Sequence, residues 1–357
     1  MMEENFDNNS LCAQLKEDRE LFLKKLIIKS FEAFPDIEIK YGKNGVERTK
    51  EDLNYHLEHL TAAVCLNDKN LFLDYAAWLK MFFTSINLPV DYQKVPFSHI
   101  KETAEELFSD RFEQQLVSIV NYVLERYDAL PAEQNSFISE NNKLNIIAQQ
   151  YMNSLLRKER TSAERIILNQ MQTGANIKEI YLYVFQPVQW EIGRLWQMNK
   201  ISVAMEHYFT AATQFIMSRL YEYIFTTKKN GRNLIAASVS GELHELGIRM
   251  VADFFEIEGW NTFYLGANTP VKSISQMIKE TGSEVLAISA TIAFNIPKVK
   301  SLISELRNEF DKTSLKIIVG GKAFNSNPEL WQNIGADGYA VDAAEAITLA
   351  NRLLKVG

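Results

Sequence analysis

The sequence NLIAASVSGELHELG occupies residues 233–247 and decides the fold of the C-terminal third of the chain. Its first seven residues form an apolar run typical of a buried strand, and a helical pattern begins directly after Gly247. A strand, loop and helix in this order indicate an open parallel sheet, in which ligands bind outside the carboxyl ends of the strands. His244 therefore lies on a loop where a ligand is expected.

The residue types in this loop favour a metal-containing ligand. A neutral imidazole nitrogen is a good ligand for a transition metal, and His244 supplies one. Glu242 can hold the other ring nitrogen and so fix the tautomer of the ring. Gly247 lets a bulky group lie close to the backbone. A lone loop histidine is more often a solvated or capping residue, so the rest of the domain has to support this interpretation.

Beyond Gly231 the sequence alternates between short apolar runs and amphipathic helical patterns. Five strand and helix pairs in this order predict a parallel, doubly wound sheet with right-handed crossovers. We therefore expect a flavodoxin-like (Rossmann-type) five-stranded domain over residues 231–357. The expected strands are 233–240, 261–266, 284–290, 315–320 and 338–341, and the expected helices are 247–257, 270–281, 297–310, 327–333 and 342–354.

Two further strand ends carry residues suited to a buried ligand. Ser289 and Thr291 alternate at the period of a strand, so their hydroxyls are expected to point the same way and to donate hydrogen bonds. Gly320 and Gly321 follow the fourth strand and leave room for a group to approach bare backbone. A double glycine after a strand is most often a simple turn, but here it adds to the loop of His244.

The pattern Glu-x-His-x-x-Gly after a first strand resembles the signature of cobalamin-binding domains. Such domains occur in methionine synthase, the mutases, the corrinoid methyl carriers and the cobalamin-dependent light-sensing repressors. The resemblance implies that His244 is the lower axial ligand of cobalt and that Ser289, Thr291, Gly320 and Gly321 surround the tail of the corrinoid. Many members have Asp at the first position, where this chain has Glu242.

Composition limits the classes of function. The chain has 357 residues, of which 46% are hydrophobic, and a net charge of -7, so two or three soluble domains are expected and a direct nucleic-acid surface is not. Cys12 and Cys65 cannot form a disulfide framework or a cysteine-rich metal site, which makes a reducing cytoplasm the natural compartment. No secretory signal or membrane-spanning run is expected.

The region before the sheet is helical in pattern and divides into two parts. Residues 1–135 are expected to form an N-terminal helical domain, which ends in a polar, proline-containing linker. Residues 136–230 are expected to form a four-helix bundle. This second region contains QWEIGRLW at residues 189–196, then a break at 199–202 with a new helix N-cap, and then Glu206 and His207. The break can bring Trp196 and the Glu-His pair to one surface.

Trp196 followed after nine residues by Glu206-His207 resembles the cap of the light-sensing cobalamin domains. The resemblance implies that these side chains cover the upper axial face of adenosylcobalamin; core packing and helix capping are the alternatives for the same residues. In the repressors a histidine follows the tryptophan and takes the upper cobalt position after light. Here that residue is Gln197, so this route is not expected, and His207 is the substitute left open.

The N-terminal region lacks the basic winged helix of those repressors. Its segment RTKEDLNYHLEH at 48–59, together with the cap and sheet, is similar to photocobilins, which hold cobalamin and biliverdin close together. This resemblance implies that Arg48 pairs with a bilin propionate and that His56 or His59 contacts the bilin. Helix capping and core packing are the alternatives here.

These observations lead to the hypothesis of a cytoplasmic light sensor that is not an enzyme. It would bind adenosylcobalamin with the base displaced and with His244 on cobalt, would bind biliverdin as a second chromophore, and would change its cap packing and oligomeric state in light. A homo-oligomer and an unknown protein output partner are expected. The alternatives are a corrinoid methyl carrier of a methyltransferase system and a light-independent cobalamin-sensing regulator.

Overall fold

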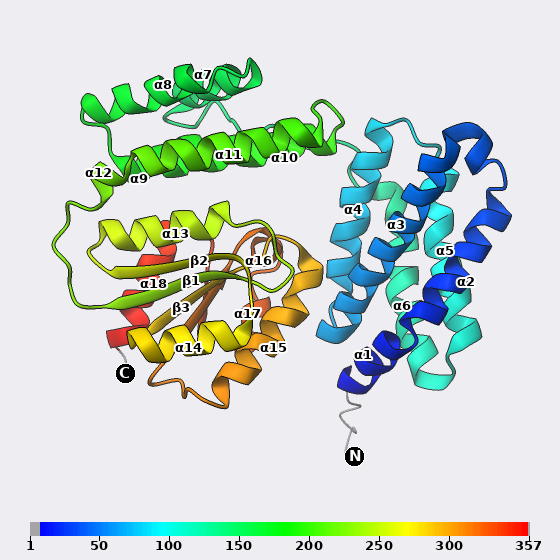
Figure 1. The fold of residues 1–357 in the computed structure, drawn as a ribbon. Coiled ribbons are helices and arrows are strands. Elements are labelled where there is room, and N and C mark those ends of the chain that lie inside the picture. Colours follow the sequence, from blue (N-terminus) through cyan, green and yellow to red (C-terminus); the bar gives the residue numbers. More distant parts are fainter. Residues whose placement is uncertain (1–7, 356–357) are drawn as a thin grey trace. The chain divides into compact units, whose positions relative to one another are not determined.

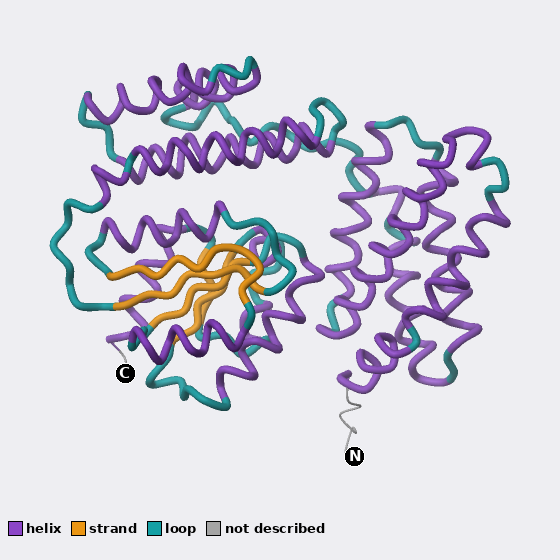
Figure 2. The backbone as a smooth tube through the Cα atoms, viewed as in Figure 1, coloured by secondary structure: helices purple, strands orange, loops and turns teal. Residues whose placement is uncertain are grey.

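The computed structural model describes residues 8–355, which form two compact units. One unit extends to Gln134 and the other begins at Asn135, inside the polar segment between residues 130 and 136. Figure 2 shows that strands occur in the second unit, where they lie among helices. Within residues 8–355, no helix is long and apolar enough to cross a lipid bilayer.

The first unit is a bundle of helices (Figure 1). Apolar residues spaced three or four apart along these helices point inward, and Phe22, Leu57, Phe72 and Phe97 are fully buried. Its elements are α1 (Asn8–Glu17), α2 (Arg19–Ala33), α3 (Ile37–Leu66), α4 (Lys69–Ser85), α5 (Val90–Leu107), α6 (Asp110–Leu124) and the short η1 (Tyr127–Ala129).

Two features of this bundle differ from a simple helical pattern. Two glycines within residues 41–45 predict a break between helices, but helix α3 continues through this segment and is kinked at Gly42, whose φ of 67° a side chain would disfavour. Helix α5 contains Pro96, which interrupts the pattern by which a helix is recognised in a sequence.

A disulfide between Cys12 and Cys65 joins α1 to α3. The cysteine count did not lead us to expect this bond, since two cysteines separated by 53 residues give no local signal of pairing. Packing of α1 along the C-terminal part of α3 brings the two Cα atoms to 4.9 Å, within the range that a disulfide needs. The assignment to a reducing cytoplasm stays a prediction.

The second unit begins with a four-helix cap. Its second and third long segments are joined through Gly174, and the third contains a π turn, η2, between two α-helical parts. The elements of the cap are α7 (Asn145–Leu156), α8 (Arg160–Gln172), α9 (Ile177–Ile180), η2 (Tyr181–Phe185), α10 (Gln186–Gln197), α11 (Val203–Arg219) and α12 (Tyr221–Ile224).

The sheet confirms the flavodoxin-like prediction. All neighbouring strands are parallel, and their order is β2-β1-β3-β4-β5, with helices on both faces (Figure 1). The strands are β1 (Asn233–Val239), β2 (Asn261–Thr269), β3 (Val285–Ser289), β4 (Lys316–Gly320) and β5 (Gly338–Ala340). The helices are α13 (Leu246–Ile257), α14 (Val271–Thr281), η3 (Ala293–Asn295), α15 (Ile296–Arg307), α16 (Lys322–Asn325), α17 (Leu330–Asn333) and α18 (Ala343–Lys355).

The cap and the sheet share one hydrophobic core. The Tyr181 ring of the cap lies 5.8 Å from the Phe254 ring of α13, and both side chains are fully buried. The Tyr181 hydroxyl donates a 2.8 Å hydrogen bond to Asp253 Oδ2 at the same boundary. Since buried polar groups need partners, this bond fixes how α13 and η2 meet.

Replacing Asp253 by asparagine is expected to stabilise the second unit at neutral pH. Burial raises the pKa of Asp253 to about 6, although hydrogen bonding by Tyr181 and the charge of Arg249 lower it. The penalty for ionising Asp253 is absent below about pH 4 and is complete above about pH 6. The new amide oxygen still accepts from Tyr181, but the attraction of Arg249 for a carboxylate is lost, so a net gain of about 1–2 kcal/mol is expected.

Urea unfolding at neutral and acidic pH measures this effect. The stability of Asp253→Asn should exceed that of the wild type at pH 7, and the difference should vanish at pH 4. If the wild type and Asp253→Asn were equally stable at pH 7 as well as at pH 4, the prediction would be contradicted.

Candidate functional site

Small residues line the carboxyl ends of the central strands. The register places Ser238 of β1 beside Ser289 of β3, Ser289 beside Gly320 of β4, and Gly320 beside Ala340 of β5. This row falls at the point where the strand order reverses between β1 and β3, which is where doubly wound sheets bind ligands. The row consists of small residues, and at Gly320 the Ala340 carbonyl oxygen would lie 2.8 Å from an added Cβ, so packing between β4 and β5 already calls for a glycine there.

Glu242 is the structural centre of the loop that follows β1. Its side chain is fully buried and accepts hydrogen bonds on both oxygens. Oε1 accepts from the backbone N–H of His244 at 3.0 Å and lies 2.5 Å from His244 Nδ1. Oε2 accepts from the backbone N–H groups of Thr291 and Ile292 at 2.9 and 3.1 Å, and from Asn295 Nδ2 at 3.1 Å. One carboxylate thus ties the loop after β1 to the loop after β3.

These contacts keep Glu242 ionised. Burial alone would raise the pKa of Glu242, but the hydrogen bonds and the charge of His244, with the backbone donors of His244 and Thr291, lower the pKa to about 2. A carboxylate bonded to Nδ1 makes Nδ1 the protonated nitrogen of a neutral His244 ring. The lone pair that can bind a metal is therefore on Nε2.

His244 has the properties of a single metal ligand. Its side chain is 53% exposed, whereas that of Glu242 is inaccessible, so the imidazole projects from a buried support. Ser238 Oγ donates a 3.1 Å hydrogen bond to the His244 carbonyl and holds the backbone from the strand side. Among residues 8–355, no group of three or more His, Cys, Asp or Glu side chains is placed to hold a metal ion. One protein ligand fits a metal whose remaining ligands come from a macrocycle.

The other residues predicted for this site lie at the same edge of the sheet. Ser289 ends β3, and Thr291 lies beyond the strand, where its backbone N–H serves Glu242. Gly320 ends β4 and Gly321 follows it. Gly247 is exposed in the first turn of α13, and a Cβ there would meet nothing within 4 Å, so the structure gives no contact that requires a glycine.

Two residues that hold the loop after β1 were not recognised from the sequence. Asn295 is fully buried and donates to Glu242 from fifty-three residues away. Asn268, near the end of β2, accepts a 2.7 Å hydrogen bond from the backbone N–H of Gly241 and has a φ of 52°. Both residues could have been recognised by their positions, because asparagine favours helix caps and left-handed turns. Asn268 lies at the end of a strand, and Asn295 directly precedes a helix.

Replacing Gly321 by alanine is expected to destabilise the second unit by about 2–3 kcal/mol. Gly321 has a φ of 96°, and a Cβ there would lie 2.5 Å from the Ala290 carbonyl oxygen and 2.7 Å from Ser289 Oγ. Gly231→Ala is the matched control, because Gly231 has a φ of 83° with nothing within 4 Å of its Cβ position. Urea unfolding should show the larger loss for Gly321→Ala; equal losses would exclude the steric contribution.

The helical cap contains the predicted hairpin. Helix α10 ends at Gln197, Asn199 adopts a left-handed conformation, and the Ser202 side chain caps α11 by accepting from the backbone N–H of Met205. Trp196 is half-buried, and Gln197 is buried. The hairpin therefore places Trp196 at the end of one helix and Glu206-His207 at the start of the next.

Glu206 and His207 form a second carboxylate and histidine pair. Glu206 Oε2 lies 2.7 Å from His207 Nδ1, and Glu206 Oε1 accepts a 3.2 Å hydrogen bond from Thr210 Oγ1. The His207 side chain is 74% exposed. Thr210 Oγ1 also lies 3.4 Å from Gln189 Oε1, the alternative acceptor for its one hydroxyl proton. The Gln189 amide donates to Thr213, so these contacts lead toward the interior of the cap.

The residues predicted to contact a bilin all lie on α3 of the first unit. Arg48 is highly exposed and pairs with Glu51. His56 is buried, with Nδ1 2.9 Å from the Tyr75 hydroxyl, and the His59 ring stacks on Tyr75 at 3.8 Å. Burial lowers the pKa of His56 to about 4 and that of His59 to about 3, so both rings are neutral at pH 7. His56 and His59 both contact Tyr75. Arg48 does not share these contacts, because its ion-pair partner, Glu51, lies on α3 as well.

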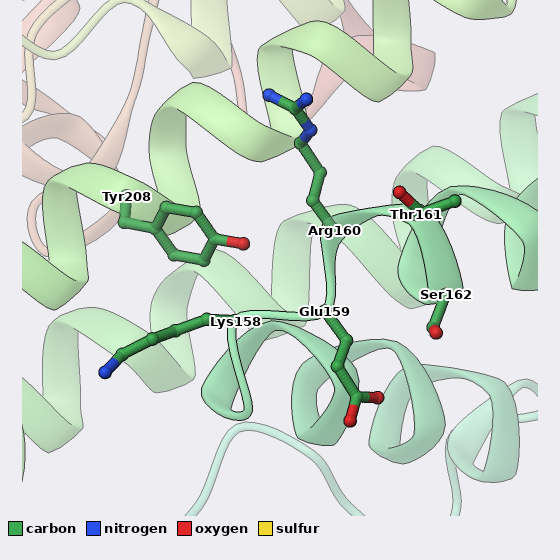
Figure 3. A pocket seen from close by; sticks show the side chains of 6 residues that line it. All are labelled: Lys158, Glu159, Arg160, Thr161, Ser162 and Tyr208. Carbon is green, nitrogen blue, oxygen red and sulfur yellow. The ribbon is translucent and has the colours of Figure 1, made fainter.

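A surface pocket lies on the helical cap, where Tyr208 of α11 points toward the turn that begins α8 (Figure 3). None of the predicted site residues lines it, so its position gives no support to the site at the sheet edge. Its lining residues are Lys158, Glu159, Arg160, Thr161, Ser162 and Tyr208.

Comparison with known proteins identifies both parts of the second unit. Residues 232–348 match a family model described as a B12 binding domain, and residues 147–221 match a second model with the same description. The solved structure of the monomethylamine corrinoid protein of Methanosarcina barkeri has a TM-score of 0.53 and 20% identity, covering 60% of this chain and all of that chain. This likeness shows a common fold.

Curated relatives match about a third of the chain. A dimethylamine corrinoid protein of Methanosarcina mazei is 27% identical over 122 residues, which is 34% of this chain and 71% of that protein. A corrinoid protein of Desulfitobacterium hafniense is 29% identical over 122 residues, 34% of this chain and 55% of that protein. Another dimethylamine corrinoid protein of M. mazei is 30% identical over 129 residues, 36% of this chain and 58% of that protein. The chain thus spans little more than half the length of the latter two.

Proposed function

We propose that this protein, whose residues 147–221 and 232–348 form cobalamin-binding domains, is a light sensor that binds adenosylcobalamin with His244 as the lower axial ligand. The observation that carries the proposal is the Glu242 and His244 pair at the carboxyl edge of the sheet, next to a helical hairpin that presents Trp196 and His207. Adenosylcobalamin, when bound, supplies a cobalt–carbon bond that visible light cleaves.

The chain's own residues would bind and report the cofactor. Glu242 holds His244 Nδ1, which leaves Nε2 to bind the cofactor, and the small residues at the ends of β1, β3 and β4 would lie against its nucleotide tail. Trp196 and Glu206 would cover the adenosyl group from the cap. Because cap and sheet share a core, a change in how the cap packs at this end would alter the surface that a partner or a second copy recognises.

A second candidate function is that of a methyl carrier in a methyltransferase system. The corrinoid proteins among the relatives favour it, since they match about a third of the chain, and the M. barkeri structure covers 60% of it. A carrier needs its upper cobalt face open to partner enzymes. The hairpin that carries Trp196 and Glu206-His207 and the additional N-terminal unit support the sensor instead.

The proposal includes a bilin bound by the first unit. The first unit would hold biliverdin without a covalent bond, because both cysteines are joined to each other. Contact with His56 or His59 would require the aromatic cluster around Tyr75 to rearrange. A sensor of cobalamin level that ignores light would use the same cobalamin site and would leave the first unit as a partner-binding module.

Absorbance spectroscopy of the full-length protein separates these candidates. The protein is purified with adenosylcobalamin and with biliverdin, and its spectrum and size-exclusion profile are recorded before and after green light. A sensor should show loss of the alkylcobalamin bands together with a change of elution volume. Bleaching without any change in elution, combined with methyl uptake from a methyltransferase, would favour the carrier, and the lack of a red band would remove the bilin.

A further inference from the structure

Helix α1 is short and presents a narrow apolar side to the helical bundle of the first unit. It has ten residues, and an isolated helix of fewer than about 12–15 residues is marginally stable in water. Leu11 and Leu15 lie one turn apart, and both side chains are fully buried. Between these two leucines lies Cys12, which the disulfide joins to Cys65 of α3. The disulfide therefore reinforces a helix that has little apolar surface of its own to hold it in place.

The chain is anchored to α3 again directly after α1. Arg19, the first residue of α2, donates hydrogen bonds from Nη2 to Asn54 Oδ1 and to Glu58 Oε1, both at 2.6 Å. Three residues further on, the Phe22 side chain is fully buried. These contacts hold α2 on α3 without any contribution from the disulfide. A displacement of α1 would therefore end at Asp18, the residue that separates the two helices.

The two sulfur atoms can separate and join again without competition from other thiols. The chain has two cysteines, and each is the partner of the other. Cys12 is partly exposed, whereas Cys65 is buried, so an attacking thiolate reaches the sulfur of Cys12 more readily. Cys12 precedes Arg19 by seven residues, which span at most about 25 Å when fully extended. Even an unravelled α1 would keep the Cys12 thiol near its partner.

Release of α1 would change the surface of the first unit. Leu11 and Leu15 would become accessible to water, and so would the part of α3 around Cys65. Ala62, which is 2% exposed, lies one turn before Cys65 on the same side of α3. The bundle would thus expose new apolar surface at one end of α3 while α2 stays in place.

We propose that the bond between Cys12 and Cys65 is a redox switch, which holds α1 on α3 when oxidised and releases residues 8–18 when a dithiol reduces it. The thiolate of the reductant attacks Cys12 Sγ, the bond between the two cysteines breaks, and its electron pair passes to Cys65 Sγ, which takes up a proton.

The second thiol of the reductant completes the reaction. It attacks the sulfur of the reductant in the mixed disulfide and displaces Cys12 as a thiolate, which is then protonated. The protein gains two electrons and two protons, and the dithiol becomes a disulfide. This switch acts within the first unit and does not depend on the cobalamin site.

Hydrogen exchange with mass spectrometry detects the release of α1 in the full-length protein. The protein is compared after treatment with oxidised glutathione and after treatment with dithiothreitol. The amides of residues 10–17 should exchange at least about 10-fold faster in the reduced protein, because a disulfide commonly shifts an opening equilibrium by more than this factor. The amides of residues 22–33 in α2 should keep the same rate, since Arg19 and Phe22 hold that helix.

Two variants show whether the disulfide itself is responsible. In Cys12→Ser the amides of residues 10–17 should exchange rapidly under both conditions, because no disulfide can form. Ala13→Ser is the matched control: it places a serine at an exposed position on the same helix, retains both cysteines, and should respond to dithiothreitol as the wild type does. Reoxidation of the wild type with oxidised glutathione should restore slow exchange.

Three results would overturn the switch. The first is equal exchange of residues 10–17 in the oxidised and the reduced protein. The second is loss of protection throughout the first unit on reduction, because the disulfide would then support the whole bundle and not α1 alone. The third is the presence of two titratable thiols in the denatured protein after oxidation, which would show that Cys12 and Cys65 do not pair. None of these results would affect the cobalamin site at His244.

Discussion

Substitution of His244 by alanine should weaken the binding of adenosylcobalamin by about 100-fold or more and should restore the spectrum of free, base-on cobalamin. The reason is that His244 is the ligand that would displace the intrinsic base of the cofactor, and its Nε2 has no replacement in this loop. Loss of an outer-sphere partner of a metal ligand already reduces affinity by about 10–100-fold, and loss of the ligand itself should lie at or beyond the upper end of this range.

Equilibrium dialysis in the dark, together with absorbance spectra, measures this effect. His99→Ala is the matched control, because it removes an imidazole from the first unit and leaves the loop of His244 unaltered. Added imidazole should partly restore the spectrum of His244→Ala. Unchanged affinity and spectrum in His244→Ala would refute its role as the lower ligand.

Replacement of Glu242 by glutamine should lower the free energy of unfolding of the second unit by about 3–5 kcal/mol even without cofactor. Glu242 accepts from three backbone N–H groups, from Asn295 Nδ2 and from His244 Nδ1. The glutamine amide would place an NH2 group where one carboxylate oxygen now accepts hydrogen bonds. The N–H groups that donate to that oxygen would then have no acceptor inside the protein. Cobalamin affinity should fall as well, because the His244 ring would lose its orientation.

The pH dependence of this effect follows from the lowered pKa of Glu242. Its stabilising contribution is present above the unfolded pKa of about 4.5 and is lost as the pH falls toward about 2, which corresponds to about 3 kcal/mol. Urea unfolding of the apoprotein should therefore show a large difference between wild type and Glu242→Gln at pH 7 and a smaller one in acid. Glu280→Gln, on an exposed helix face, is the control and should change stability by less than about 0.5 kcal/mol.

Sequence and structure agree best where the signal is local. Glu242 and His244 are two residues apart on one loop, so their pairing and its place at a strand end follow from spacing and from the alternation of strands and helices. The hairpin between Trp196 and Glu206 was predictable for the same reason, because Asn199 and Ser202 mark the end of one helix and the start of the next.

Features that depend on the tertiary fold were missed. Asn295 reaches Glu242 only because β1 and β3 are neighbours in the sheet. This neighbour relation cannot be read from the sequence. Cys12 and Cys65 meet only because α1 packs on α3. His56 is likewise buried because three helices meet around it, where it contacts Tyr75 and Phe97. The sequence led us to expect a ligand contact at His56, but its ring already has a protein partner.

The core shared by the cap and the sheet means that these two layers form one cooperative folding unit. The boundary between residues 230 and 231 separates two patterns of sequence, but Tyr181 and Phe254 bury each other across it. Expressed alone, residues 231–357 would present to water the face of α13 that now carries Phe254 and Asp253, and would be prone to aggregate. Transfer of the cobalamin-binding domain to another protein is therefore expected to require the whole segment from Asn135 onward.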